Sequence, residues 1–369
     1  MSWSTVRADQ FCTLITDGTH DSPKPQQSGW KLITSKHQKG HYIDFDSANW
    51  ISEADYLKVI SRSAVEQWDI LFSMIGTIGN IYLEKNPHVE YACKNMGIFK
   101  FSGNKENALW MYYYLKSPQA KAYIQTHLRG STQAYVPLGG LREMPVPVPP
   151  QSVRNEIIAV LRPIDEKIEC NNAINDNLQQ QAQAIYSSMF IDNPDPAWSH
   201  GHLSDLITVK YGKDHKKLAD GIYPVYGSGG IMRYVERPLY NKESVLIPRK
   251  GTLNNVMYVN QPFWSVDTMF YTEMKLPNVA KFVYHFVKAK DLASMNAGSA
   301  VPSMTTDILN AMEVVIPSAS ALEEFESLVA PMYEAMEAND VQSKALSQMR
   351  DTLLPKLMSG EIDVSDIQL

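Results

Sequence analysis

The chain carries a long repeat of itself, and this constrains its fold more than any other feature. Two segments that begin at Pro149 and Pro317 match at a constant offset of 168 residues. Upstream, residues 69–80 and 244–255 also correspond, at an offset of 175, and each reads as a buried strand followed by a glycine turn. Insertions and deletions gather in loops. The repeat therefore predicts a variable globular part followed by a helix of fixed length, twice over.

Each helical segment has a seam of residues spaced alternately by four and three positions, which is typical of a coiled coil. About 33 residues per helix, at 1.5 Å each, give a rod of roughly 50 Å. The alternative is two amphipathic helices that each pack only on their own domain. The seam positions are Ile157, Leu161, Ile164, Ile168, Asn171, Asn175, Leu178 and Ile185 in the first helix, and Phe325, Val329, Met332, Met336, Asn339, Ser343, Leu346 and Leu353 in the second.

Both seams turn polar near the helix midpoint, at Asn171 and Asn175 and at Asn339 and Ser343. If the helices pair antiparallel about that point, Asn171 lies near Ser343 and Asn175 lies near Asn339. A buried polar layer costs stability but penalises slips in register. The hypothesis is that this layer fixes the register of the helix pair, and the alternative is that these residues mark bends or exposed turns.

The repeat divides the chain into four segments: a domain at residues 1–148, a helix at 149–192, a second domain at 193–316, and a helix with a C-terminal tail at 317–369. Short β-branched and aromatic runs alternate with Gly, Asp and Pro turns in both domains. Helices are expected from Glu106 to Leu128 and from about Val279 to Ala289. The predicted fold class is a duplicated α/β or α+β domain with a twisted sheet, joined by two long antiparallel helices about an internal pseudo-twofold repeat.

The net charge of −6 is unevenly distributed. Residues 321–369 hold ten acidic and three basic side chains, a charge of −7, which leaves +1 for the other 320 residues. DNA binding needs only a local basic face, so the overall acidity does not exclude it. No apolar run is long enough for a membrane span, the N-terminus is not that of a signal peptide, and three scattered cysteines fit a reducing compartment. A cytoplasmic protein is expected.

Loops between the predicted strands hold polar and basic residues suited to a DNA groove. Arg and Lys reach guanine acceptors, Asn and Gln pair with adenine, and nearby Gly lets backbone amides approach phosphates. Polar, glycine-containing loops are mostly just loops, but these recur at matched places in both halves. The candidates are Thr19, His20, Lys24, Ser35, Lys36, His37, Thr77, Arg129, Ser131, Thr132 and Gln133 in the first half, and Tyr211, Lys213, Tyr226, Ser228, Arg249, Lys250, Thr252, Asn254 and Asn255 in the second.

Signals for catalysis are missing from the sequence. It holds no phosphate-binding loop of the Gly-x-x-x-x-Gly-Lys-Ser/Thr type, and no histidine spacing of a zinc protease. Two Asn-Pro pairs, at Asn86 and Asn193, lack the aromatic residue that would stack on a flipped base. The nearest imitation of a nuclease site is Asp267 with Glu273 and Lys275, whose spacing is short. We expect no catalytic centre and no metal site in this chain.

The duplicated layout and several phrases resemble the specificity subunit of Type I restriction-modification systems. The phrases are Asp17-Gly-Thr-His20, Ile33-Thr-Ser-Lys36 and Gly76-Thr-Ile-Gly79 in the first half, and residues 223–230, Pro248-Arg-Lys-Gly-Thr252, Phe263-Trp-Ser-Val-Asp-Thr268 and residues 353–362 in the second. The resemblance covers nearly the whole chain, and the duplication is its specific part.

The resemblance implies two target-recognition domains held apart by antiparallel spacer helices, each domain reading one half of a split, asymmetric DNA site. It also implies partners that carry the chemistry. Two modification subunits would methylate adenine with S-adenosylmethionine, and restriction subunits would use ATP and Mg²⁺ to cut unmodified double-stranded DNA. No cofactor is expected in this chain. The acidic face of residues 323–340 is either part of the docking surface for these partners or a solvated helix face.

The two halves depart from each other where DNA contact is expected. Met74 and Ile75 stand in the first half where Arg249 and Lys250 stand in the second, and Gly79 corresponds to Asn254. Different half-sites are therefore expected. A coiled-coil scaffold that binds proteins is the alternative function, and it would lack sequence-selective DNA binding. A self-sufficient methyltransferase-nuclease is disfavoured by the missing motifs.

Overall fold

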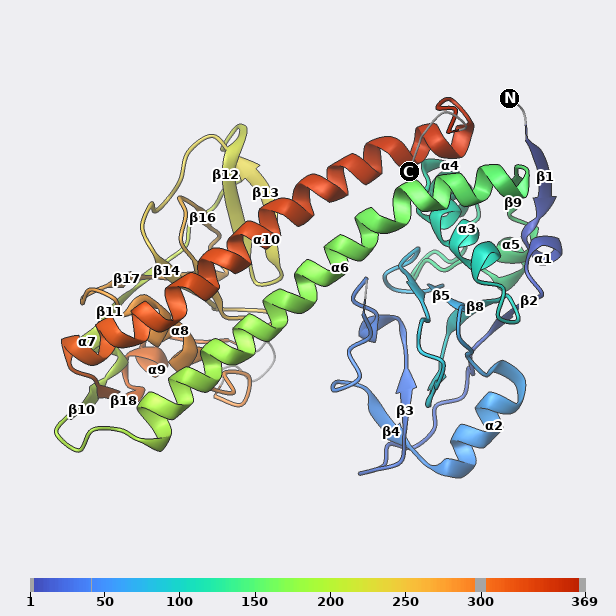
Figure 1. Ribbon diagram of the computed structural model, residues 1–369. Coiled ribbons are helices and arrows are strands. Elements are labelled where there is room, and N and C mark those ends of the chain that lie inside the picture. Colours follow the sequence, from blue (N-terminus) through green and yellow to red (C-terminus); the bar gives the residue numbers. More distant parts are fainter. Residues whose placement is uncertain (1–2, 41, 296–302, 365–369) are drawn as a thin grey trace. The chain divides into compact units, whose positions relative to one another are not determined.

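The computed structural model describes residues 3–40, 42–295 and 303–364 (Figure 1). The chain divides into two compact units. Unit 1 comprises Met1–Asn171 and Asp340–Leu369, and unit 2 comprises Asn172–Asn339. The long helices α6 (Gln151–Ser187) and α10 (Ala319–Ser359) each contribute one half to either unit. The four segment boundaries expected from the repeat remain predictions, because the two units divide within the helices.

Unit 1 alternates short strands with helices. Before α6 its elements are β1 Ser4–Arg7, α1 Ala8–Phe11, β2 Leu14–Asp17, β3 Trp30–Ile33, η1 Ser35–His37, β4 Asn49–Ile51, α2 Glu53–Ser63, β5 Ile70–Ser73, β6 Ile81–Leu83, β7 Tyr91–Cys93, β8 Met96–Lys100, α3 Lys105–Lys116, α4 Pro118–Thr126, α5 Leu138–Glu143 and β9 Pro145–Val148.

Unit 2 places its strands in the same order along the chain. Between α6 and α10 its elements are the π-helical turn η2 Ser188–Asp192, β10 Ser199–His202, α7 Leu203–Leu206, β11 Ile207–Tyr211, β12 Asp220–Gly227, β13 Gly230–Val235, β14 Ser244–Pro248, β15 Met257–Val259, β16 Trp264–Ser265, β17 Met269–Met274, α8 Ala280–Lys288, α9 Thr306–Asn310 and β18 Glu313–Ile316.

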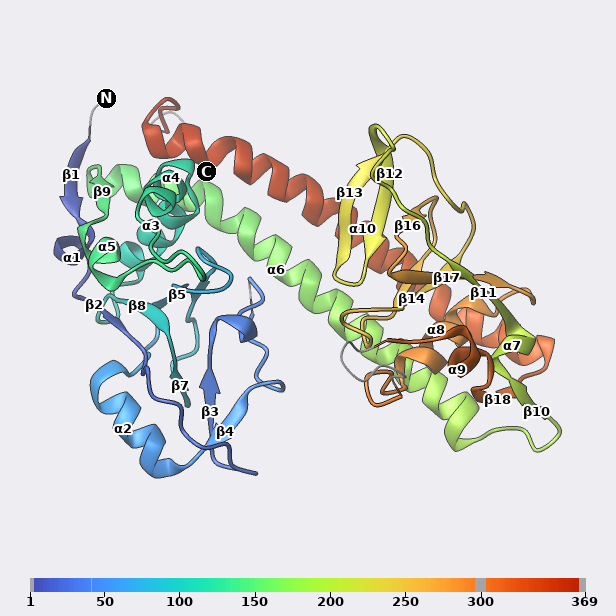
Figure 2. The same cartoon turned by 180° about the vertical axis from the view of Figure 1, so that it is seen from behind.

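The sheets of the two units share one topology, which confirms the internal repeat. The four-stranded sheets have the orders β2-β8-β5-β6 and β11-β17-β14-β15, and the three-stranded sheets have the orders β4-β3-β7 and β13-β12-β16. A two-stranded ribbon, β1-β9 or β10-β18, completes each domain. The buried strands expected before the glycine turns are β5 and β14, and every residue of both is buried. Figure 2 shows the same elements from behind.

The helix predicted from Glu106 to Leu128 is wrong, because two helices occupy this segment. Ser117 has φ −70° and ψ 154°, so it ends α3 and caps α4 through its Oγ, which accepts from the Ala120 amide at 3.3 Å. The ring of Pro118 disfavours helical backbone at the residue before it. The helix predicted over 279–289 is α8. In the described part of unit 2, α2 and α4 have no counterparts.

The largest hydrophobic core of each unit includes one end of both long helices. In unit 1, Ile157 and Leu161 of α6 and Leu357 of α10 join the cluster that contains Trp110 and Phe99. In unit 2, the other ends join a cluster around α8, through residues that include Ala182, Tyr186, Phe325 and Val329. Burial of such apolar surface is the main term that favours folding. The helices therefore pack on their domains as well as on each other.

Polar contacts near the helix midpoints confirm the predicted antiparallel pairing. In unit 1, Asn171 is fully buried and its Nδ2 donates to Ser343 Oγ at 3.1 Å and to Gln342 Oε1 at 2.9 Å. In unit 2, Asn339 Nδ2 donates to Asn175 Oδ1 at 2.8 Å. The role of this layer in fixing the register stays a hypothesis. It is supported by the fact that these amides find partners in the observed register.

A buried carboxylate fastens the helices to the domain in unit 1. Asp165 on α6 accepts from Lys116 Nζ at 3.0 Å and from Arg350 Nη1 at 2.8 Å, so it joins α3, α6 and α10. Its side chain is 10% exposed. Burial by itself raises the pKa of Asp165, but the neighbouring ammonium and guanidinium groups outweigh it and hold the pKa below the ordinary value.

Unit 2 fastens its helices to the domain through different groups. Lys281 on α8 is 4% exposed and lies between Glu243 at 3.2 Å and Glu326 of α10 at 2.5 Å. The buried ring of His285 contacts Gln183 of α6 at 2.8 Å and Tyr333 of α10 at 2.9 Å. Burial lowers the pKa of His285 to about 4, so the ring is neutral near pH 7.

Two further points concern membrane spans and the three cysteines. Within the described ranges, no helix is both long and apolar enough to cross a lipid bilayer. Cys12 and Cys93 are buried, whereas Cys170 is exposed on α6. Burial raises the pKa of both buried thiols. The last residues of the predicted C-terminal tail, 365–369, lie outside the described residues.

Replacing the buried carboxylate tests its role. We expect Asp165→Asn to lower the free energy of unfolding by about 3 kcal/mol at pH 7, because two partly buried cations lose their anion. The folded pKa of Asp165 is depressed, so the carboxylate contributes fully above the unfolded value of about 3.9, and its contribution fades at lower pH. The gap between wild type and variant, measured by chemical denaturation, should be constant from about pH 8 to 5 and narrow below about pH 4.

The matched control for this measurement is Glu166→Gln. Glu166 pairs with Arg162 on the exposed face of the same helix, where both side chains are more than 40% exposed. An exposed pair of this kind contributes little. Equal effects of the two substitutions would contradict the role assigned to Asp165.

Candidate nucleic-acid interface

In unit 1 the ends of several strands meet at one edge of the domain. β2 and β5 both run antiparallel to β8, so Asp17 pairs with Gly97 and Ser73 pairs with Met96. β3 runs parallel to β7, which leads directly into β8. The loops after β2, β3, β5 and β7 therefore leave from the same edge. We call this edge, with the segment 127–137, the first loop edge.

Contacts between these loops bring most of the predicted residues of the first half together. A Cβ on Gly76, next to Thr77, would lie 3.4 Å from Ser35 Oγ. Ile75 and Arg129 both form β-bridges with Tyr135, which ties the segment 129–135 to the loop after β5. The exposed members of the set are His20, Lys24, Lys36, Thr77, Arg129, Ser131, Thr132 and Gln133.

Three of the predicted residues have structural roles instead. His37 is 1% exposed, and its Nδ1 accepts from the Thr34 amide at 2.9 Å, which closes the cap of the short helix η1. Burial also lowers the pKa of His37. Because the side chain is almost fully buried, its ring has no exposed edge to offer to DNA in this conformation. Thr19 is buried too, and its Oγ1 accepts from the Asp21 amide. The third residue is His20.

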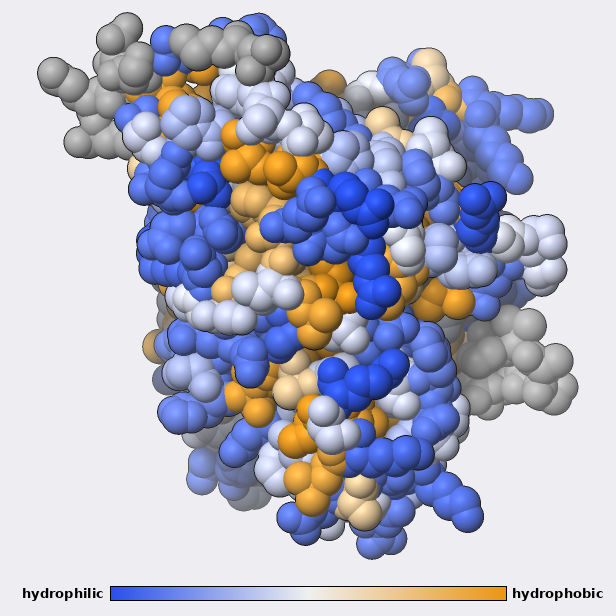
Figure 3. All heavy atoms as spheres, turned by 90° about the vertical axis from the view of Figure 1, so that its right-hand side faces the viewer, coloured by the Kyte–Doolittle hydropathy of each residue, from blue (hydrophilic) through white to orange (hydrophobic). Residues whose placement is uncertain are grey.

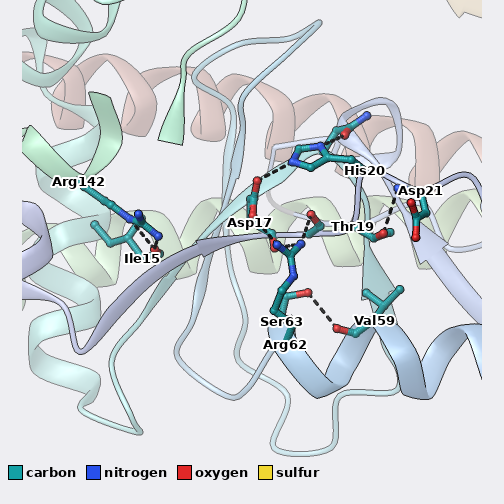
Figure 4. A network of polar contacts seen from close by, with 11 residues as sticks. Ile15, Asp17, Thr19, His20, Asp21, Val59, Arg62, Ser63 and Arg142 are labelled. Carbon is teal, nitrogen blue, oxygen red and sulfur yellow. Dashed lines mark hydrogen bonds and ion pairs between the residues drawn. The ribbon is translucent and has the colours of Figure 1, made fainter. Parts of the chain in front are cut away.

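His20 is exposed, but both of its ring nitrogens are engaged, as Figure 4 shows in part. Nε2 lies 2.8 Å from Asp17 Oδ2, and Nδ1 lies 2.8 Å from Asn95 Oδ1. Asp17 is 7% exposed and also faces Arg62 of α2, whose Nη1 lies 3.5 Å from Asp17 Oδ1. His20 therefore ties the loop after β2 to the turn between β7 and β8.

Unit 2 forms a second loop edge by the same topology. Tyr211 pairs with Phe270, and Pro248 pairs with Met269, so β11 and β14 end beside the start of β17. Lys213 donates its amide to the Ser265 carbonyl at 2.8 Å. The second loop edge comprises the loops after β11, β12, β14 and β16.

Basic and aromatic side chains meet at the second loop edge. The guanidinium of Arg249 lies 5.4 Å from the centre of the Tyr211 ring, and its Nη1 donates to the Asp267 carbonyl at 3.3 Å. Such cation–π contacts orient arginine without using all of its donors. Tyr211 is 52% exposed, and Lys213, Lys250 and Thr252 are exposed as well. Arg249 is half-buried.

The remaining predicted residues of unit 2 support these loops. Tyr226 is 8% exposed, and its hydroxyl accepts from Gln261 at 3.3 Å. Asn255 Nδ2 donates to the Ser228 carbonyl at 2.8 Å, and Asn254 Nδ2 donates to Asp291 at 3.0 Å. These amides hold neighbouring turns together in this structure, so direct pairing with a base would require them to exchange partners.

One glycine in each unit permits the close packing of these loops. A Cβ on Gly18 would lie 2.3 Å from the Cys93 carbonyl oxygen, and a Cβ on Gly212 would lie 2.0 Å from that of Val266. No side chain fits at such distances. Gly18 and Gly212 occupy matching places directly after β2 and β11. The constant offsets of the sequence repeat do not align these two glycines.

Sequence analysis missed several residues at these edges. Lys94 donates its amide to the Ile33 carbonyl, and Tyr135 is 42% exposed. In unit 2 the hairpin β12-β13 exposes Ile231 by 48% and Met232 by 61%. The only signal for the hairpin is the Gly229-Gly230 turn between two β-rich runs, which predicts a hairpin but not its exposure.

The structure separates the residues that imitate a nuclease site. Asp267 lies in the turn before β17, whereas Glu273 lies near the other end of that strand. Glu273 faces Lys210 at 3.6 Å, and Lys275 Nζ donates to the Ser204 carbonyl at 2.6 Å. Among the described residues, no group of three or more His, Cys, Asp or Glu side chains is arranged to hold a metal ion.

Two similar domains, each with a loop edge and a share of two long helices, define a class of internally duplicated two-domain proteins. The family model of the Type I restriction modification DNA specificity domain matches residues 3–180 and again 197–325. The chain therefore belongs to the Type I restriction-modification specificity family.

Individual relatives agree with this assignment. The chain is 24% identical to the Type I restriction enzyme MjaIX specificity subunit of Methanocaldococcus jannaschii, over 88% of this chain and 84% of the relative. It is 20% identical to the HindI specificity subunit of Haemophilus influenzae, over 85% and 90%. The crystal structure of the Type I S subunit from M. genitalium has the same fold, with a TM-score of 0.57 and 17% identity over 97% and 96% of the two chains.

Adding a methyl group at one glycine tests the packing of the second loop edge. We expect Gly212→Ala to lower the free energy of unfolding by about 2–3 kcal/mol, because its Cβ collides with backbone that cannot move aside cheaply. The control is Gly229→Ala in the same unit, where no atom lies within 4 Å of the added Cβ. Thermal unfolding of both variants measures the difference, and similar melting temperatures would contradict the prediction.

Proposed function

We propose that this chain is the DNA sequence-recognition subunit of a Type I restriction-modification complex. Each domain reads one half of a bipartite, asymmetric site in double-stranded DNA. The observation that carries the proposal is the repetition of one loop edge in both units, with polar and basic side chains at matched places of the same topology. A scaffold for proteins alone would have no reason to repeat such an edge.

The exposed and half-buried side chains at the edges have the donors that base and phosphate recognition needs. Lys36, Arg129 and Gln133 serve at the first loop edge, and Lys213, Arg249 and Lys250 serve at the second. Arginine in the major groove donates to guanine, and glutamine pairs with adenine. Lysines beside glycine turns suit the phosphates that set register and orientation. The buried residues His37, Thr19 and Tyr226 shape the edges but do not read bases.

The two halves of the site differ in sequence because the two edges differ in chemistry. The segment after β5 presents Gly76 and Thr77, whereas the segment after β14 presents Arg249 and Lys250. Only unit 1 has α2 among the described elements. The proposal gives α6 and α10 the task of setting the number of base pairs between the half-sites, since a rigid separator makes half-site spacing a geometric property.

The chain targets chemistry that partner subunits perform. Modification subunits methylate adenine with S-adenosylmethionine, and restriction subunits cleave unmodified DNA with ATP and Mg²⁺, while this chain is not itself catalytic.

Exposed apolar side chains on the long helices suit such partners: Ile174, Leu328, Val341 and Met349 are each at least 40% exposed. The face of unit 1 in Figure 3 also shows hydrophobic groups among the hydrophilic ones. In the acidic segment 323–340, Glu326 forms an ion pair with Lys281 of its own domain. A docking face for partner subunits on this segment therefore consists of the other, exposed carboxylates.

An exchange of the first domain tests the proposed function. The chain is expressed with its partner modification subunit, and adenine methylation is mapped across the genome before and after residues 1–148 are replaced by those of a relative. We expect a split motif that changes in one half and keeps the other half and the gap. An unchanged motif, or no motif, would contradict the proposal. Either result would favour a protein scaffold that does not select DNA sequences.

A single substitution tests the second loop edge. We expect Arg249→Ala to weaken binding of the complex to its cognate DNA about tenfold, because a well-placed arginine contact discriminates by about 1–3 kcal/mol. The control is Arg237→Ala. Arg237 is exposed beyond β13, at the end of the hairpin opposite to its turn, and should not affect binding. Titration of labelled DNA at one fixed salt concentration compares the two, and equal affinities would exclude Arg249 from the interface.

A further inference from the structure

The turns that follow β2 and β11 share one backbone plan. We call Asp17–His20 the first turn and Tyr211–Asp214 the second turn. The glycine amide of each turn donates to the carbonyl of the first residue of the neighbouring antiparallel strand, β8 or β17. The amide of the next residue donates to the carbonyl of the last residue of β7 or β16. These bonds are Gly18 to Met96 at 2.9 Å, Thr19 to Cys93 at 2.9 Å, Gly212 to Met269 at 3.0 Å and Lys213 to Ser265 at 2.8 Å.

Different side chains complete the two turns. In the first turn, Arg62 at the end of α2 donates through Nη2 to the carbonyls of Asp17 at 3.2 Å and Gly18 at 3.0 Å (Figure 4). The same guanidinium faces the Asp17 carboxylate, which in turn orients His20. One arginine therefore fixes both the backbone and the side chains of this turn.

The second turn is completed from the sheet itself. Trp264 of β16 donates through its Nε1 to the Lys213 carbonyl at 2.8 Å. Trp264 is 7% exposed, so its indole ring is anchored in the core while its donor reaches the turn. In the described part of unit 2, no helix takes the place of α2.

We propose that Arg62 and Trp264 are positioning residues for sequence recognition, each acting on one half-site only. Neither residue needs to touch a base, since each holds the turn from which neighbouring side chains reach the DNA. Hydrogen-bonded readout depends steeply on distance and angle, so a turn that moves by a fraction of an ångström reads less selectively. This inference rests on the proposed function and adds the residues that set its accuracy.

The test compares Arg62→Gln and Trp264→Phe in the full chain, expressed with the partner modification subunit. Methylation is measured at cognate sites and at sites with one altered base in either half, and the domain exchange shows which half belongs to residues 1–148. We expect R62Q to reduce discrimination about tenfold in the first half-site alone, and W264F to do so in the second alone. A mismatched base pair ordinarily costs a factor of roughly 5 to 150, so this loss is measurable.

The control for R62Q is Lys58→Gln, which removes the same charge one turn earlier on α2. Lys58 pairs with Asp21 in an exposed contact, with side chains 72% and 67% exposed. With K58Q, the complex should discriminate between methylation sites as the wild-type complex does. Arg62→Lys keeps the charge but loses the forked guanidinium, and should lower discrimination in the same half-site by a smaller factor.

Three outcomes would overturn the inference. The first is that R62Q and K58Q are indistinguishable, and the second is that R62Q reduces discrimination equally in both halves. The third is that R62Q weakens binding on all sequences with a shallower salt dependence, which is the signature of a phosphate contact. These results leave the proposed function intact as long as the wild-type chain directs methylation to a split motif. Absence of that motif counts against the proposed function itself.

Discussion

The structure depends on hydrophobic contacts between segments that lie far apart in the chain. The core of unit 1 contains residues near the start of α6 and residues near the end of α10, about two hundred positions later. The core of unit 2 contains the opposite ends of the same helices. Neither domain is complete without both helices. Burial of apolar surface therefore stabilises each domain and holds the ends of both helices against it.

Polar groups make the packing of each domain against the long helices specific. Asp165 accepts from Lys116 and Arg350, and Lys281 lies between Glu243 and Glu326, so each domain is fastened to its helices by a different charge arrangement. Buried charges are costly unless they are paired, and a mispaired domain would leave them without partners. The same logic applies to Asn171 and Asn339, whose Nδ2 groups donate hydrogen bonds to the facing helix in the observed register. The fold thus repeats its shape while varying its polar contacts.

The two units combine a shared frame with loops that differ between them, as the proposed function requires. The strands β5 and β14 are buried throughout, whereas the loops that follow them carry Thr77 in one unit and Arg249 and Lys250 in the other. A rigid sheet edge holds the loops, and the loops are free to change because few core residues lie in them. Gly18 and Gly212 mark where this frame cannot vary, since backbone occupies the space of a side chain.

The sequence by itself determined the duplication, the helix seams and the pairing of Asn171 with Ser343, because periodic apolar spacing and a constant offset are properties of the chain alone. It also placed most of the candidate residues in or beside the loops that follow strands, since strands and glycine turns have local signatures. It did not predict the break at Ser117, although Pro118 signalled it. Only the tertiary structure decided which loop residues remain exposed. His37 and Tyr226 are buried, and His20 is held by Asp17 and Asn95, through contacts with residues distant in the sequence. Burial and hydrogen bonding of this kind depend on which segments meet, and no local pattern specifies that.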